Sequence, residues 1–117
     1  MDEKVLKWLY DIKLSIEEIE SYFPNSEEDF SEYDGNLMMK RAVERNLEIV
    51  GEAMNRIVKK DESFKDRITG SVAIIGLRNQ IIHAYDNISD ENIKSILTTH
   101  LILLKKEINV LINEIES

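Results

Sequence analysis

The chain contains no cysteine, one proline and four glycines among its 117 residues. Without cysteine it has no disulfide framework, no thiolate metal site and no cysteine nucleophile. Folds built from many short strands need frequent turns, so the scarcity of proline and glycine favours long helices. No apolar run approaches the roughly 20 residues that a membrane span requires, and residues 1–20 lack the apolar core of a secretory signal. We therefore expect an all-α, cytoplasmic protein with no membrane partner.

The composition is that of a globular protein, with 43% apolar and 32% charged residues. Its length suits a single domain, residues 1–117. The net charge of −8 argues against a protein that coats nucleic acid broadly. Residues 36–85 nevertheless carry nine basic and six acidic side chains, a local net charge of +3. This excess predicts either a local basic surface or, in the simpler interpretation, residues that merely solvate helix faces: Lys40, Arg41, Arg56, Lys59 and Lys60.

Apolar residues recur at steps of three and four in three segments, which predicts amphipathic helices, and they surround most of a fourth segment, which predicts a further helix. The segments are approximately 3–23, 36–59, 71–85 and 90–115. Pro24 should end the first helix, and Ser89 occupies the N-cap position of the last. Residues 26–31 and the polar stretch 60–70 each leave room for a short helical turn. The pattern predicts an antiparallel up-down bundle of four main helices plus short helical turns.

Gly51 lies inside the second predicted helix. A glycine there costs roughly 1 kcal/mol relative to alanine. A close approach of a second helix would explain its presence.

The segment 71–85 combines the most apolar sequence of the chain with five polar side chains: Arg78, Asn79, Gln80, His83 and Tyr85. Apolar residues surround most of this helix, which predicts burial. Burying a guanidinium without partners costs several kcal/mol. These groups must therefore satisfy one another, or line a cleft that opens to water or to a partner subunit.

Arg78 and His83 do not stack on one face of their helix, and two arrangements could bring them together. On an ideal helix Asn79 and His83 lie one turn apart, whereas Arg78 and His83 lie about 140° apart. Arginine is long enough to fold back toward the histidine. A second copy related by a two-fold axis could also supply the missing half of the site.

An arginine and a histidine together fit phosphodiester cleavage. Histidine has an ordinary pKa near 6.5, so it can take a proton from a ribose 2′-OH or give one to the leaving 5′ oxygen. Arginine offers a planar fork that holds phosphate and stabilises the charge gained in the transition state. This chemistry needs no metal or other cofactor, and no metal ligand set is apparent.

Two sequence blocks carry a resemblance to a known family. GLRN at residues 76–79, followed by IHAY at 82–85, resembles the signature of HepT proteins in the HEPN superfamily, which is Arg, four residues, His, any residue, Tyr. Upstream, RNLEIVGEA at residues 45–53 resembles a second segment of the same family. The blocks occur in the family order, and the resemblance covers nearly the whole chain. One departure is the absence of the Pro-Trp turn that many relatives carry, where this chain has residues 63–68.

The resemblance implies a helical bundle that forms a homodimer and places both Arg/His pairs in a shared cleft. It implies a metal-independent RNA endonuclease that is the toxin of a toxin–antitoxin pair. The antitoxin would be a minimal nucleotidyltransferase that adds AMP to the motif tyrosine. Carried over by position, Arg78 stabilises the phosphate, His83 is the general acid or base, and Tyr85 is the modified residue. Our own inference is that Asn79 orients His83 or the substrate.

Two other functions stay open at this point. The chain could be a non-catalytic module that binds a nucleotide or a nucleotidyltransferase partner. It could also be a plain dimeric bundle with a structural role.

Four further residues have simpler interpretations. His100 falls on the apolar stripe of the last helix and is expected to be a structural histidine. Trp8 should pack against the core or contribute to a dimer face. Glu48 and Glu52 lie one turn apart, but two carboxylates alone make a weak metal site, and salt-bridged or solvated glutamates are expected.

Overall fold

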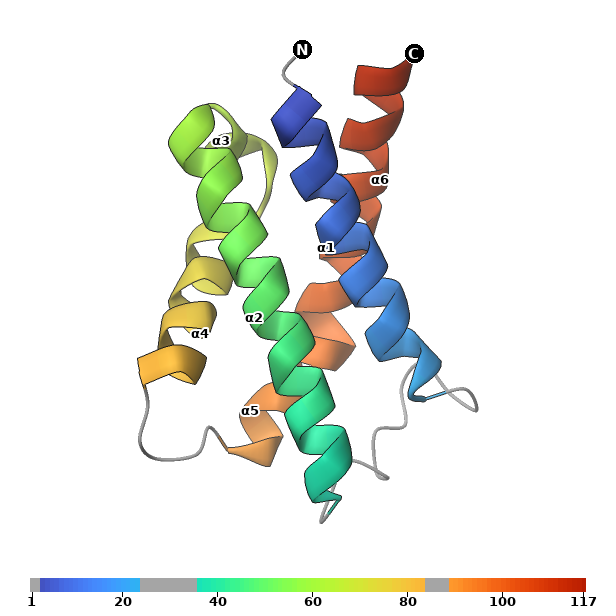
Figure 1. Ribbon diagram of the computed structural model, residues 1–117, viewed down its shortest axis with the longest axis vertical. Coiled ribbons are helices and arrows are strands. Elements are labelled where there is room, and N and C mark those ends of the chain that lie inside the picture. The colour runs from blue at the N-terminus through green and yellow to red at the C-terminus, as the bar shows by residue number, and fades with distance from the viewer. Residues whose placement is uncertain (1–2, 24–35, 84–88) are drawn as a thin grey trace.

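The structure is a computed structural model that describes residues 3–23, 36–83 and 89–117, and every regular element within these ranges is helical (Figure 1). The elements are α1 (Glu3–Ser21), α2 (Leu37–Lys60), α3 (Phe64–Arg67), α4 (Ser71–His83), α5 (Asp90–Ser95), a π-helical segment (Ile96–His100) and α6 (Leu101–Glu116). The all-α prediction is confirmed, and α3 is the short turn expected within residues 60–70. Pro24, the predicted turn at 26–31 and Tyr85 lie outside the described residues.

The long helices run alternately down and up, and the first residues of α1 lie at the same end of the molecule as the last residues of α6 (Figure 1). Helix α2 packs against α1 on one side and α4 on the other, and α6 packs against α1. Helix α4 therefore lies at the edge of the bundle (Figure 1). Among the helices that the structure describes, none has both the length and the apolar character that crossing a membrane would require.

Side-chain caps fix where two of the helices begin. The Asn36 side chain accepts a hydrogen bond from the Met39 N–H at 3.0 Å and caps α2. The Ser89 hydroxyl accepts one from the Asn92 N–H at 3.1 Å, which confirms the predicted N-cap of the last helix. These caps satisfy backbone donors that the first helical turn would otherwise leave without partners.

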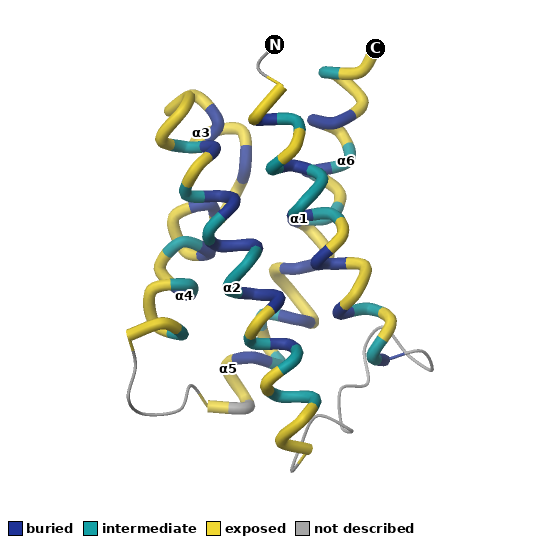
Figure 2. Tube along the Cα trace, viewed as in Figure 1, coloured by how far each residue is buried: buried dark blue, intermediate teal, exposed yellow. Residues whose placement is uncertain are grey.

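The core is a continuous set of apolar side chains on the inner faces of the helices (Figure 2). In α1 the buried positions follow the predicted three- and four-residue steps: Val5, Leu9, Ile12, Ile16 and Ile19. Partly buried side chains, Trp8 among them, pack against this core. The packing role expected for Trp8 is therefore confirmed.

The last helical stretch departs from its predicted stripe at His100. The buried positions are Ile93, Leu97, Leu101 and Leu104, while His100 is exposed. The wider turn of the π-helical segment Ile96–His100 inserts one residue into the stripe, so Leu101 takes the inward position. The prediction that His100 is a core histidine is wrong for this reason.

Helix α4 is buried on one face only (Figure 2). Its buried residues are Ser71, Ile74 and Leu77, whereas Val72 is 61% and Ile82 40% exposed. The prediction of burial on nearly every side is therefore wrong for the single chain. The cause is the position of α4 at the edge of the bundle, where α2 covers its inner face and leaves other apolar side chains on the surface.

Candidate functional site

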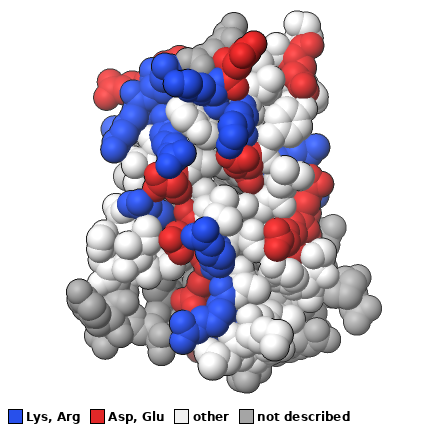
Figure 3. All heavy atoms as spheres, in the orientation of Figure 1, with Lys and Arg blue, Asp and Glu red and all other residues white. Residues whose placement is uncertain are grey.

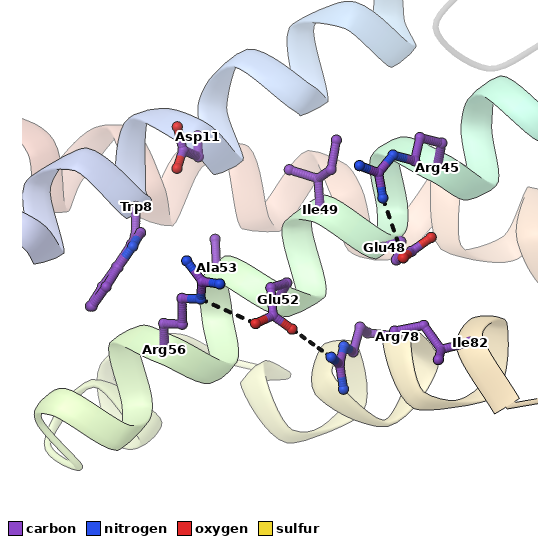
Figure 4. Close-up of a pocket in the computed structure, with 10 residues that line it drawn as sticks. All are labelled: Trp8, Asp11, Arg45, Glu48, Ile49, Glu52, Ala53, Arg56, Arg78 and Ile82. Carbon is purple, nitrogen blue, oxygen red and sulfur yellow. Dashed lines mark hydrogen bonds and ion pairs between the residues drawn. The ribbon is translucent and has the colours of Figure 1, made fainter.

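A groove of about 340 Å³ runs along the outer face of α2 and is flanked by residues of α1 and α4 (Figure 4). We call it the α2 groove, and it is lined by Trp8, Asp11, Arg45, Glu48, Ile49, Glu52, Ala53, Arg56, Arg78 and Ile82. Half of these side chains come from the segment 45–53, and two come from α4, including the motif arginine. The two sequence blocks that resemble one family therefore face each other across one groove.

Arg78 is held in the groove by contacts from two directions. Its Nη2 lies 2.6 Å from Oε2 of Glu52, and its Nη1 donates to Oδ1 of Asn79 at 2.8 Å. The other carboxylate oxygen of Glu52 accepts from Nε of Arg56 at 3.1 Å, as Figure 4 shows. Two guanidinium groups thus share a single carboxylate. The Arg78 side chain keeps a quarter of its surface exposed, so a ligand in the groove can reach it.

Gly51 sets how closely α2 and α4 approach at Arg78. A Cβ atom built on Gly51 would lie 2.2 Å from Cβ of Arg78 and 3.1 Å from the backbone oxygen of Ile74. Only a residue without a side chain fits at this distance. The predicted close helix approach is confirmed, and it presses the stem of Arg78 against α2.

The remaining charges of the groove are arranged in pairs. Arg45 lies 3.3 Å from Glu48, and Lys7 lies 2.8 Å from Asp11. Glu48 and Glu52 are therefore salt-bridged, as expected. Within residues 3–23, 36–83 and 89–117, no three His, Asp or Glu side chains gather in a way that could hold a metal ion.

Basic and acidic side chains alternate down the middle of the face in Figure 3, and a separate group of Lys and Arg gathers where α2 ends and α3 begins. Arg56 contacts Glu52 and lines the groove. Arg56 is an exposed residue that pairs with a neighbour on its own helix, as the simpler interpretation expected, and it also lines the groove.

His83 lies apart from the α2 groove. It is the exposed last residue of α4, it is not among the residues that line the groove, and no hydrogen bond joins its side chain to a described residue. On an ideal helix it stands about 7.5 Å along the axis from Arg78 and about 140° around it. The chain alone brings Arg78 together with Asn79 and not with His83.

Sequence reasoning about the catalytic site missed that Glu52, Arg56 and Trp8 line the same groove as Arg78. One signal was available: Glu52 and Arg56 stand four residues apart, next to a glycine that predicted a helix contact. The spacing of residues within α2 could not show which helix packs against Gly51. That knowledge requires the contact between Gly51 and Arg78.

The chain is similar to known proteins over most of its length. A family model described as ribonuclease HepT-like matches residues 12–111. Two relatives come from Methanocaldococcus jannaschii. The protein named "Putative RNase MJ1380" is 32% identical over 106 residues, which cover 91% of this chain and 94% of the relative. The protein named "Putative RNase MJ1216" is 29% identical over 109 residues, which cover 93% and 88%. No solved structure matches the chain.

Proposed function

This chain belongs to the family of HepT-like ribonucleases, and on that premise we propose that it is a metal-independent RNA endonuclease acting as the toxin of a toxin–antitoxin pair. The observation that carries the proposal is the placement of Arg78. Its guanidinium lines an open groove and shares one carboxylate with Arg56. Such a pair suits a phosphate group, because arginine binds phosphate through planar, charge-assisted hydrogen bonds.

In the proposed reaction the ribose 2′-oxygen attacks phosphorus and the bond from phosphorus to the 5′ oxygen breaks. The products are a 2′,3′-cyclic phosphate and a 5′-hydroxyl end. His83 takes the proton from the 2′-OH or gives one to the leaving 5′ oxygen, and Arg78 stabilises the negative charge on the phosphate. Asn79 holds the Arg78 guanidinium through its side-chain oxygen.

We further propose that the working unit is a homodimer. Arg78 and His83 do not meet within one chain, and α4 leaves two apolar side chains exposed, Val72 and, at the edge of the α2 groove, Ile82. A second copy packed against this face would cover the apolar side chains and bring the His83 of one chain toward the Arg78 of the other.

Tyr85 is the proposed site of regulation by a minimal nucleotidyltransferase antitoxin. It follows His83 by two residues in the sequence. Adding AMP there would place a bulky, negatively charged group near the histidine, where it would repel the RNA phosphate. Such a pair would act in the cytoplasm.

The purified chain should cleave total RNA and tRNA in the presence of excess EDTA. The products should carry 2′,3′-cyclic phosphate ends, because the 2′-OH is the nucleophile. A gel assay with end-group analysis measures both. If the protein binds a nucleotide or a nucleotidyltransferase but never cuts RNA, it is a non-catalytic binding module and the nuclease proposal is wrong.

The dimer proposal predicts rescue when two inactive variants are mixed. Arg78→Ala and His83→Ala should each be inactive alone. In a mixed dimer, one of the two shared sites would contain an intact Arg78 and an intact His83. After exchange of subunits, an equal mixture should recover about a quarter of wild-type cleavage, since half of the dimers would be mixed and each would have one intact site. No recovery despite proven exchange would show that the site is not shared.

A further inference from the structure

The end of the α2 groove nearest to Trp8 has no part in the cleavage chemistry proposed above. Trp8 is the only tryptophan of the chain. Its ring is partly buried against the core and also lines the groove, where Ile49 and Ala53 add apolar surface. Figure 4 shows Trp8 reaching from α1 to the side of Arg56, with Glu52 and then Arg78 beyond it. An aromatic surface therefore lies beside Arg56, in the same groove as the pair of guanidinium groups.

The charge of the groove leaves a place for one anion. Arg45 pairs with Glu48 and Asp11 pairs with Lys7, so these contacts are balanced. Arg56 and Arg78 carry two positive charges and share the single carboxylate of Glu52. When Lys7, which pairs with Asp11 from outside the lining, is counted, the groove has one positive charge in excess, and this matches the single negative charge of a phosphodiester.

We propose that the α2 groove binds one unstacked nucleotide of an RNA strand, with its base against Trp8 and its phosphate between Arg56 and Arg78. This inference rests on the proposed function and names the form of RNA that the site accepts. Single-stranded RNA is commonly recognised by stacking splayed-out bases on aromatic rings and on arginine. The volume of about 340 Å³ lies at the lower end of the range for small-ligand pockets, which suits one nucleotide. The strand would thus be held by a nucleotide next to the bond that is cut.

Because Trp8 is the only tryptophan, its fluorescence reports directly on the proposed stacking. The full-length His83→Ala variant, which binds without cutting, is titrated with a short single-stranded oligoadenylate RNA. Saturable quenching of the tryptophan signal is expected. Ribose 5-phosphate and inorganic phosphate, which lack a base, should cause no quenching at the same concentrations.

Variants of the same His83→Ala protein test the contribution of the ring. Trp8→Leu should weaken binding of a labelled RNA about tenfold or more, as measured by fluorescence anisotropy, while Trp8→Tyr should keep most of the affinity. Arg56→Ala should weaken binding as well. Arg67→Ala is the matched control, because Arg67 is also ion-paired and exposed but lies away from the groove, against Glu114.

The outcomes separate this inference from the nuclease proposal. One outcome is that RNA binds without quenching the tryptophan fluorescence, that Trp8→Leu binds it with unchanged affinity, and that the wild type still cleaves it. This outcome overturns the nucleotide subsite and leaves the nuclease proposal intact. Saturable quenching by RNA that the wild type never cuts supports the subsite and overturns the nuclease proposal. Quenching that follows protein concentration alone shows that a second copy fills the groove, which also overturns the subsite.

Discussion

Replacing His83 with alanine should lower the rate of RNA cleavage between about 10²-fold and 10⁴-fold, the contribution expected of a general acid or base. The fold should survive, because His83 is exposed, ends its helix and forms no side-chain hydrogen bond with a described residue. Far-UV circular dichroism and the midpoint of thermal unfolding should therefore match the wild type. In cells, the variant should lose any growth inhibition that depends on cleavage.

The chain supplies its own control for this substitution. It contains two histidines, and the second, His100, is also exposed. His100→Ala should cut RNA as fast as the wild type, because nothing places His100 in the α2 groove. Equal cleavage by His83→Ala and the wild type would refute the role given to His83, whatever becomes of the bundle.

The helices themselves were predictable because local spacing determines them. The apolar steps in α1, the N-cap at Ser89 and the presence of a turn between α2 and α4 all depend on residues near one another in the chain. Gly51 also indicated a contact between residues that are far apart in the sequence. A glycine inside an otherwise regular helix is unfavourable, so its presence predicted that a second helix packs closely against α2 at this position.

The partners across the groove were not predictable from spacing. Glu52 and Arg78 are 26 positions apart, and no periodicity says which face of α2 meets α4. The exposure of one side of α4 was not predicted. A helix that is apolar on most sides is expected to be buried, but its sequence does not show which other elements bury it. In this structure α2 buries only one face. The π-helical segment was not predicted for a different reason. The sequence position of His100 fits the regular apolar stripe of the last helix, but the residue inserted by the π-helical turn moves His100 off that stripe.

Replacing Gly51 with alanine should damage both stability and cleavage. The new Cβ would lie 2.2 Å from Cβ of Arg78, an atom fixed to the backbone of α4, so no side-chain rotation relieves the clash. The helices must separate by more than about 1 Å to reach ordinary contact distance. Overpacking of this kind costs about 1–3 kcal/mol, and the better helix propensity of alanine offsets about 1 kcal/mol of that. Thermal unfolding should show the net loss as a lower midpoint.

The effect on cleavage should exceed the effect on folding. Moving α4 displaces Arg78 from Glu52 and from the phosphate position, and a displacement near 1 Å can cost about 10²-fold in rate. Cleavage is therefore measured well below the unfolding midpoint, where the variant is folded. A Gly51→Ala protein that is as stable and as active as the wild type would mean that the contact between α2 and α4 is not as close as described.

Gly76→Ala is the matched control, because Gly76 is also inside a helix but a Cβ there meets nothing within 4 Å. The substitution should raise the free energy of unfolding by up to about 1 kcal/mol, through helix propensity alone. Cleavage and self-association should also stay at the wild-type level, unless the second copy proposed above approaches α4 closely at Gly76. If Gly76→Ala is more stable as a monomer yet loses both cleavage and self-association, a second chain must approach α4 at this glycine as closely as α2 does at Gly51.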